Sequence, residues 1–226
     1  MHVLTIPLLA LVVMTSAWYL TRSVLSFALR RNLLDVPNHR SSQGNPTPCS
    51  GGCSFVLTFS LAASIFGVLH LLQPVETLGL LLGLLVVGVG CWDDYIGLPI
   101  RVRLLVQLAA CASAVACLGG LARSHDLTGN ATVAFAAVLG TWLALAWLIN
   151  FANFMDGING IAGAEAVIVA GICCALSTMA HGVNVVALLF AVLAASATGF
   201  LIWNWYPARI FMGDAGAGFL ASASAL

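Results

Sequence analysis

The sequence predicts an all-α membrane protein, a polytopic bundle of transmembrane helices with seven full spans and a truncated eighth. Of its 226 residues, 61% are hydrophobic and 7% are charged, against about 25% charged residues in a typical soluble domain. A soluble core could not bury this much apolar surface, so lipid must surround most of the chain. No internal repeat or linker divides the sequence, which indicates one integral-membrane domain over residues 1–226.

Apolar runs of spanning length recur along the chain. Each full run has about 18 to 21 residues, enough to cross ~30 Å of hydrocarbon. Backbone groups that face lipid must be satisfied within their own segment, so the runs are predicted to be helices. They begin near Val3, Ser54, Val75, Arg103, Ala131, Ile161 and Val183, and the truncated eighth begins near Gly213.

Arginines are distributed unevenly between the two sides that alternating spans define. The segments after the first, third, fifth and seventh spans carry six, against Arg123 alone on the other side. Positive residues are retained in the cytoplasm, so these segments are predicted to be cytoplasmic, with the N-terminus and residues 121–130 outside. The six are Arg30, Arg31, Arg40, Arg101, Arg103 and Arg209.

Acidic residues gather on the same side. Asp93 and Asp94 are adjacent at the end of the third span, and Asp214 lies between Gly213 and Gly216 at the start of the eighth. Carboxylates together with phosphate oxygens suit Mg²⁺, and a helix N-terminus beside glycines favours phosphate. A solvated helix end would also explain the acid pair, and a helix cap would also explain Asp214.

The stretch NFANFMDGINGIAG, residues 150–163, places polar residues and glycines between two spans. Asn150, Asn153, Asp156 and Asn159 recur every three residues. If the fifth helix continues through them, they form one polar stripe that could bind a ligand. The alternative is a helix–turn–helix packed closely through its small residues.

Arginines next to these motifs are candidate anion ligands. Arg103 and Gln107 share a helix face, and Arg40 lies in a loop rich in Pro, Gly and Asn. Arg103 could instead serve only as a topology anchor, and the loop that contains Arg40 could serve only to link two helices. Cys49 and Cys53 flank SGG without nearby metal-ligand residues, and the cysteines within apolar runs are expected to be small core residues.

Four motifs in this order resemble the polyprenyl-phosphate N-acetylhexosamine-1-phosphate transferases, or glycosyltransferase family 4. They are DVPNHRSS with PTP and GG, DDYIGLPIRVRLLVQ, NFMDGINGIAG and FMGDAG. The DVPNHRSS and NFMDGING sequences are most similar to those of bacterial members that start O-antigen or other surface-polysaccharide synthesis. Gln43 stands where the family often has His, and Asn159 stands where other branches have a carboxylate.

The resemblance implies transfer of a HexNAc-1-phosphate from a UDP-N-acetyl sugar to undecaprenyl or another polyprenyl phosphate, with release of UMP. It implies Mg²⁺ or Mn²⁺, a bacterial inner membrane, a cytoplasmic active site and, in some members, a homodimer. Asp93, Asp94 and Asp214 are then the catalytic and metal-binding residues. The substrate-binding residues are Arg40, Arg103, Asn150, Asn153, Asp156, Asn159 and Phe211.

Two other functions compete with transfer. A cation-coupled transporter could use Asp156 and Asp214 as ion sites, although such sites lie near the bilayer midplane in repeated folds. A non-catalytic relative is the other alternative. The eighth run stops at Leu226, short of ~30 Å, so we expect the sequence to be a fragment that is inactive as given.

Overall fold

The protein is an all-helical membrane protein apart from one very short strand pair. The computed structural model describes residues 2–35, 46–72, 77, 84, 87–93, 96, 99–117, 119–213, 215, 216 and 219. The helices are α1 (His2–Arg31), α2 (Gly52–Val68), α4 (Ile100–Cys117), α5 (Gly120–Thr128), α6 (Ala131–Met155), α7 (Ile161–His181) and α8 (Val185–Asn204). Strand β1 (Leu34–Asp35) pairs antiparallel with β2 (Thr47–Pro48), a feature that the all-α prediction missed.

Four helices are long and apolar enough to cross a membrane within the described residues: Ile6–Arg31 of α1, and all of α6, α7 and α8. A fifth span results if α4 and α5, which meet at a bend of 51°, are taken together. The described part of the chain therefore does not show the seven full spans that were predicted. The runs predicted from Val75 and Gly213 lie mostly outside the described residues.

Two further details differ from the sequence prediction. Helix α2 has 17 residues, fewer than the predicted run, because the chain turns at Leu69 and His70, where His70 adopts a φ of 54°. Residues predicted to form the outside segment 121–130 are mostly helical, in α5. Gly119, which precedes α5, has a φ of 95°, a left-handed conformation that favours glycine.

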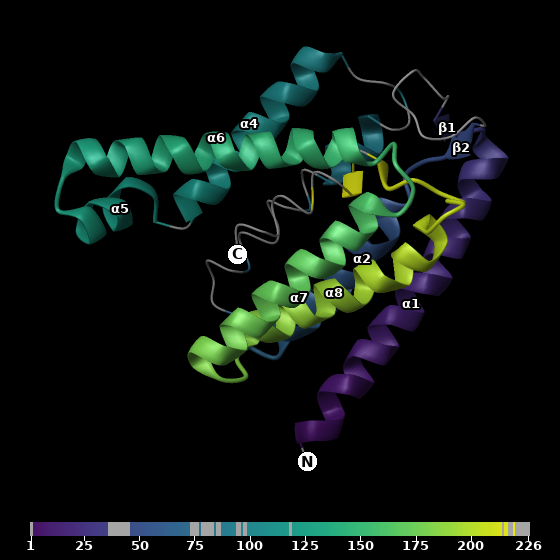
Figure 1. Ribbon diagram of the computed structural model, residues 1–226, viewed down its shortest axis with the longest axis horizontal. Coiled ribbons are helices and arrows are strands. Elements are labelled where there is room, and N and C mark those ends of the chain that lie inside the picture. Colours follow the sequence, from purple (N-terminus) through teal and green to yellow (C-terminus); the bar gives the residue numbers. More distant parts are fainter. Residues whose placement is uncertain are drawn as a thin grey trace.

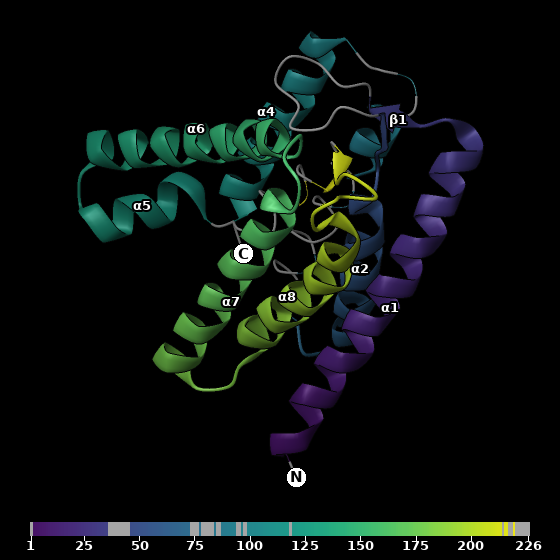
Figure 2. The same cartoon turned by 45° about the vertical axis from the view of Figure 1, so that its right-hand side comes forward.

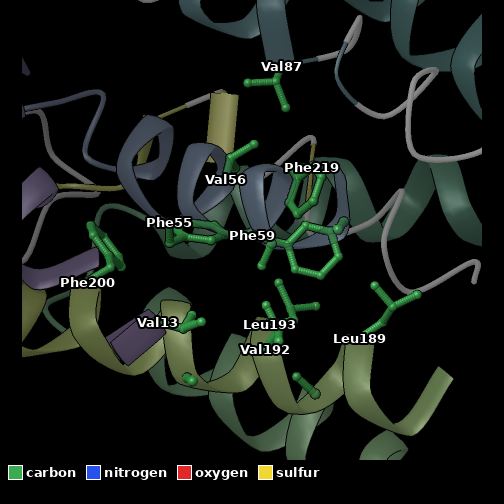
Figure 3. Close-up of a cluster of buried hydrophobic side chains, with 14 of the residues drawn as sticks. Val13, Phe55, Val56, Phe59, Val87, Leu189, Val192, Leu193, Phe200 and Phe219 are labelled. Atoms are coloured by element: carbon green, nitrogen blue, oxygen red, sulfur yellow. The ribbon is translucent and has the colours of Figure 1, made fainter. Parts of the chain in front are cut away.

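The helices form two groups (Figure 1). Helices α1, α2, α7 and α8 run side by side, whereas α6, with α4 and α5 beside it, runs across their direction, as Figure 2 also shows. In the first group, the buried rings of Phe55 on α2 and Phe200 on α8 pack together, and the ring of Phe219 packs against Phe55 and Phe59 of α2 (Figure 3). The second group has a smaller cluster around Cys111 and Ile149.

Helix α8 packs against α1 at very close range. A Cβ on Gly199 would overlap the carbonyl oxygen of Met14 and lie 2.8 Å from the Ala17 Cβ and 2.9 Å from the Trp18 nitrogen. Lipid provides no hydrophobic drive between helices, so close backbone approach at small residues is a main source of their packing energy. Across α1 and α2, the buried hydroxyls of Thr21 and Ser54 add a hydrogen bond of 2.7 Å.

We predict that Gly199→Ala destabilises the protein by about 1–3 kcal/mol, because the added methyl group forces α1 and α8 apart. Thermal unfolding in detergent, followed by tryptophan fluorescence, measures the change. The matched control is Gly171→Ala in α7, where a Cβ has no neighbour within 4 Å. Equal unfolding temperatures for the two variants would contradict the predicted role of Gly199.

Candidate active site

The loop before α2 and the loop after α8 are joined by backbone hydrogen bonds. The Phe211 amide donates to the Pro48 carbonyl at 2.8 Å, and the Gly51 amide donates to the Phe211 carbonyl at 2.8 Å. The Gly52 amide then donates to the Met212 carbonyl at 2.7 Å. Residues 48–52 and residues 211–212, which are far apart in sequence, therefore lie against each other. Residues 211–212 extend beside the loop before α2 much as a strand would.

Two glycines make this approach possible. A Cβ on Gly51 would lie 2.8 Å from the Phe211 carbonyl oxygen, and one on Gly52 would overlap the backbone of Gly216. No side chain fits between these backbones. The sequence motif included Gly51 and Gly52 without a reason for glycine at these positions. The close approach of the two backbones explains why glycine is needed there.

The Asp156 carboxylate fixes the loop after α8 from the other side. Its Oδ1 accepts a hydrogen bond of 2.8 Å from the Met212 amide, and its Oδ2 accepts one of 2.6 Å from the Gly213 amide. Asp156 is 9% exposed, and Gly213 has a φ of 76°, which favours glycine. A carboxylate that accepts hydrogen bonds from two consecutive backbone amides holds that backbone in place. Asp156 therefore positions the segment that leads into Asp214.

The predicted polar stripe of four is only partly correct. Asn150 and Asn153 lie on the last two turns of α6, and Asp156 is the C-cap with helical dihedral angles. The helix ends there, so Asn159 lies in the turn before α7 and leaves the stripe. The Asn159 Oδ1 accepts a hydrogen bond of 3.3 Å from the Ala208 amide, a second connection to the loop after α8.

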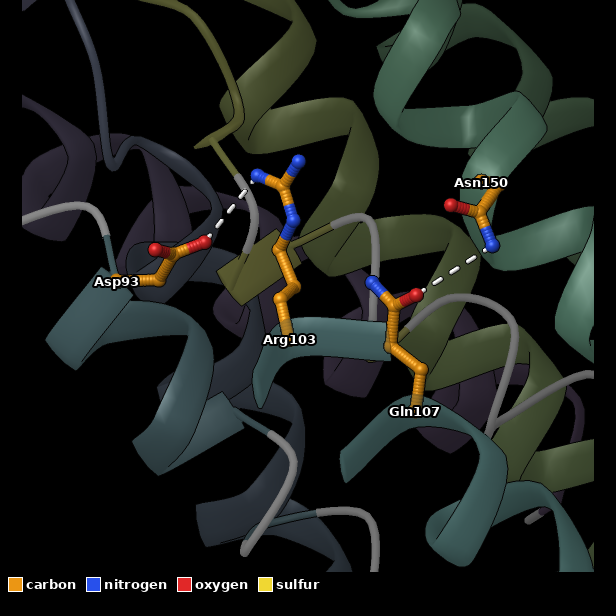
Figure 4. A network of polar contacts seen from close by, with 4 residues as sticks. All are labelled: Asp93, Arg103, Gln107 and Asn150. Atoms are coloured by element: carbon orange, nitrogen blue, oxygen red, sulfur yellow. Dashed lines mark hydrogen bonds and ion pairs between the residues drawn. The ribbon is translucent and has the colours of Figure 1, made fainter. Parts of the chain in front are cut away.

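A second polar network joins α4 to α6 and to the end of the third predicted span (Figure 4). The Arg103 guanidinium lies 3.2 Å from the Asp93 carboxylate, with side chains that are 38% and 5% exposed. One turn later, Gln107 accepts a hydrogen bond of 3.3 Å from the Asn150 amide. The predicted shared face of Arg103 and Gln107 is confirmed, because both point from α4 toward these partners.

Asn153 lies between the two networks. It follows Asn150 by one helical turn and precedes Asp156 by the same interval. Its Oδ1 is buried and accepts no hydrogen bond from the residues that the structure describes. Leaving such an atom unpaired costs about 1–3 kcal/mol, so an unpaired carbonyl oxygen between two bound networks is a candidate ligand contact.

Phe211 has a different environment from the one that the resemblance implies. Its side chain is 3% exposed, so the ring packs inside the protein. A substrate-binding residue would be expected to have an exposed surface, which this ring lacks.

Three of the predicted site residues, Arg40, Asp94 and Asp214, lie outside the described residues. Among the residues described, no group of three or more His, Cys, Asp or Glu side chains is placed to hold a metal ion. Asp93 is the described member of the predicted set of metal ligands. It is buried, and its carboxylate lies beside the Arg103 guanidinium.

Sequence reasoning missed Asn204, at the end of α8. It is fully buried, and its Nδ2 donates to the Ile210 carbonyl at 3.0 Å, which turns the chain toward Phe211. The available signal was an asparagine at the end of the most apolar helix, just before the FMGDAG motif. Its Oδ1 is, with that of Asn153, a buried side-chain oxygen without a partner in the described part of the chain.

Comparison with known proteins decides the family. Residues 77–226 match the sequence profile of glycosyl transferase family 4. The chain belongs to this family. The matched range contains Asp93, Arg103, the α6 stripe and the loop after α8, so the two networks described above are features of a family 4 protein.

Several curated relatives are about equally similar. The decaprenyl-phosphate N-acetylglucosaminephosphotransferase of Mycobacterium tuberculosis is 30% identical over 234 residues, covering 92% of this chain and 56% of the relative. The phospho-N-acetylmuramoyl-pentapeptide-transferase of Lactiplantibacillus plantarum is 30% identical over 210 residues, covering 83% and 63%. A probable undecaprenyl-phosphate N-acetylglucosaminyl 1-phosphate transferase of Bacillus subtilis is 29% identical over 213 residues, covering 89% and 56%. The chain thus spans somewhat more than half the length of these relatives.

We predict that Asp156→Asn loosens the loop after α8. An amide has one acceptor oxygen and would turn its NH₂ toward the second backbone donor, leaving a buried N–H unpaired at a cost of about 1–3 kcal/mol. Hydrogen exchange of the peptide covering residues 205–213 should accelerate about 5- to 150-fold.

The matched control for that measurement is Asp126→Asn, the same chemical change at an exposed position of α5. Exchange should stay at the wild-type rate in the control. A wild-type rate in Asp156→Asn as well would show that the carboxylate does not hold the loop.

Proposed function

We propose that this family 4 protein transfers a HexNAc-1-phosphate from a UDP-N-acetyl sugar to a polyprenyl phosphate, undecaprenyl phosphate being the expected acceptor, with release of UMP. The observation that carries the proposal is the Asp93–Arg103 pair, which places a half-exposed cation beside a buried carboxylate. The names of the relatives support the same class of reaction, since they specify decaprenyl or undecaprenyl phosphate and N-acetylglucosamine phosphate.

The reaction joins two anions. An oxygen of the lipid phosphate attacks the β-phosphorus of the UDP-sugar, a new P–O bond forms, and the bond to UMP breaks. The second pKa of a phosphate monoester is about 6, so the attacking phosphate is mostly dianionic at pH 7 and needs no strong base. The larger barrier is electrostatic repulsion between the reactants. Arg103, which is 38% exposed, can offset negative charge there while Asp93 keeps its guanidinium in place.

The α6 residues have two roles in this proposal. Asn153 has a buried carbonyl oxygen that can accept a hydrogen bond from a nucleotide or sugar donor. Asn150, fixed by Gln107, and Asp156, fixed on Met212 and Gly213, hold the helix end on either side of it. We propose Asn159, Phe211 and Arg40 as further contributors to the substrate site, as the family resemblance implies.

Asp93, Asp94 and Asp214 are the residues that would hold Mg²⁺ or Mn²⁺. The oxygen-only donor set fits these hard cations, and Asp93 offers a buried carboxylate. A bound divalent cation would neutralise phosphate charge and align the reacting groups. Asp156 contributes indirectly, because it fixes the two residues that precede Asp214.

The protein is a multi-pass membrane protein of a bacterial family. We propose that its active site faces the cytoplasm, with the N-terminus outside, because of the arginine distribution. From the motif resemblance we also propose that the protein starts O-antigen or other surface-polysaccharide synthesis and that it forms a homodimer. The muramoyl-pentapeptide relatives make a phospho-MurNAc-pentapeptide donor the alternative substrate.

We predict that Arg103→Gln lowers transfer at least about 30-fold, roughly 2 kcal/mol in the barrier, because it removes the cation and leaves Asp93 buried without its guanidinium. Formation of lipid-linked product from radiolabelled UDP-N-acetylglucosamine measures the rate, in the longest natural polypeptide that contains this sequence. The control is Arg101→Gln, two residues earlier and exposed, which should stay within about threefold of wild type. Equal losses in both variants would count against a specific role for Arg103.

We predict that Asp214→Asn lowers the transfer rate at least about a hundredfold, roughly 2.7 kcal/mol, because it removes a metal-binding charge while keeping the shape of the side chain. Removal of divalent cations with a chelator should abolish transfer, and added Mg²⁺ or Mn²⁺ should restore it. Asp126→Asn serves as the control of identical chemistry at an exposed site. A near-normal rate in Asp214→Asn would remove this residue from the metal site.

A further inference from the structure

Two cysteines that lie 38 residues apart in sequence meet beside the candidate site. The sulfur atoms of Cys53 and Cys91 are 2.6 Å apart. Both side chains are partly buried against the main core cluster. A disulfide bond measures ~2.05 Å, so the two sulfur atoms lie close to bonding distance.

The surroundings of the pair connect it to both parts of the site. Cys91 precedes Asp93 by two residues. Cys53 lies in the first turn of α2, directly after Gly52, whose amide bonds to the Met212 carbonyl. The two sulfur atoms thus bridge the segment that ends at Asp93 and the turn that supports the loop after α8.

The other cysteines that the structure describes have different surroundings. The Cys49 thiol donates to the Leu33 carbonyl at 3.7 Å, and Cys111 is buried in the α4–α6 cluster. Cys173 and Cys174 are neighbours on α7 and pack against the core. Among the described residues, Cys53 and Cys91 are the pair whose sulfur atoms meet.

We propose that Cys53 and Cys91 form a reversible dithiol–disulfide site that fastens the first turn of α2 to the segment carrying Asp93. A reducing cytoplasm keeps such a pair as two thiols, and an oxidised low-molecular-mass disulfide converts it. The inference stands on the geometry of the two sulfur atoms and does not depend on the proposed transferase activity.

The chemistry is two thiol–disulfide exchanges. One cysteine thiolate attacks the low-molecular-mass disulfide, forms a mixed disulfide and releases one small thiol. The second cysteine thiolate attacks the protein sulfur of that mixed disulfide, forms the Cys53–Cys91 bond and releases the second small thiol. The protein loses two electrons and two protons, which the oxidant gains, and an excess of small thiol reverses both steps.

The test uses the chain in lipid nanodiscs, oxidised with glutathione disulfide. Remaining thiols are blocked under denaturing conditions, the protein is reduced, and newly exposed thiols receive a maleimide mass tag. Wild type and the control variant Cys49→Ser should gain two tags, which prior treatment with reduced glutathione removes. Cys53→Ser and Cys91→Ser should each gain at most one, and peptide mapping of oxidised wild type should recover a Cys53–Cys91 cross-link.

A second measurement tests whether the Cys53–Cys91 bond stabilises the fold. The oxidised wild-type protein should unfold about 5 °C or more above its reduced form, because the bond closes a long loop, whereas the Cys53→Ala/Cys91→Ala double variant should show no such rise. The cross-link map and the unfolding temperatures of oxidised and reduced wild type test the proposal even if the variants fold poorly. No disulfide in oxidised wild type, a disulfide made through Cys49, or a disulfide without a rise in unfolding temperature would each overturn the proposal.

Discussion

The hydrogen bonds from the Met212 and Gly213 amides to the Asp156 carboxylate are the contact on which the candidate site depends. Asp156 ends α6, and its two partners begin the segment after α8. Both groups are largely buried, so the amides would lack water if the carboxylate moved, and charge-assisted hydrogen bonds are about twice as strong as neutral ones. The carboxylate at the end of α6 thus acts together with the backbone hydrogen bonds from the loop before α2 to orient that segment.

The end of α6 also explains how two polar networks coexist in so apolar a chain. Asn150 connects to Gln107 on α4, whose neighbour Arg103 meets Asp93. Asp156 connects to the loop after α8. A helix rotates about 100° per residue, so residues three apart lie on adjacent parts of one face, and this face carries polar groups to both networks. Asn153, between them, keeps an unpaired buried oxygen.

Lipid as the solvent shapes the rest of the architecture. Large apolar side chains such as Leu61, Trp147 and Met179 are exposed, which suits contact with acyl chains. Helix α8 is packed by close approach to α1 at Gly199 and by aromatic rings shared with α2. The same use of small residues recurs at Gly51 and Gly52, where backbones rather than helices come together. Glycine thus serves both the packing of spans and the assembly of the site.

The sequence alone indicated that lipid surrounds this protein and that α6 and α7 start at Ala131 and Ile161, because composition and local periodicity carry those signals. It also contained the motifs that identify the family. It also predicted that Arg103 and Gln107 share a face, a consequence of helical spacing. It did not determine that Asn159 leaves the polar stripe, since a helix end depends on the turn that the rest of the fold requires. The partners of Asp156, the burial of Phe211 and the meeting of Cys53 with Cys91 were decided only by the tertiary structure. Each depends on segments distant in sequence, and no periodicity within one segment records which other segment will pack against it.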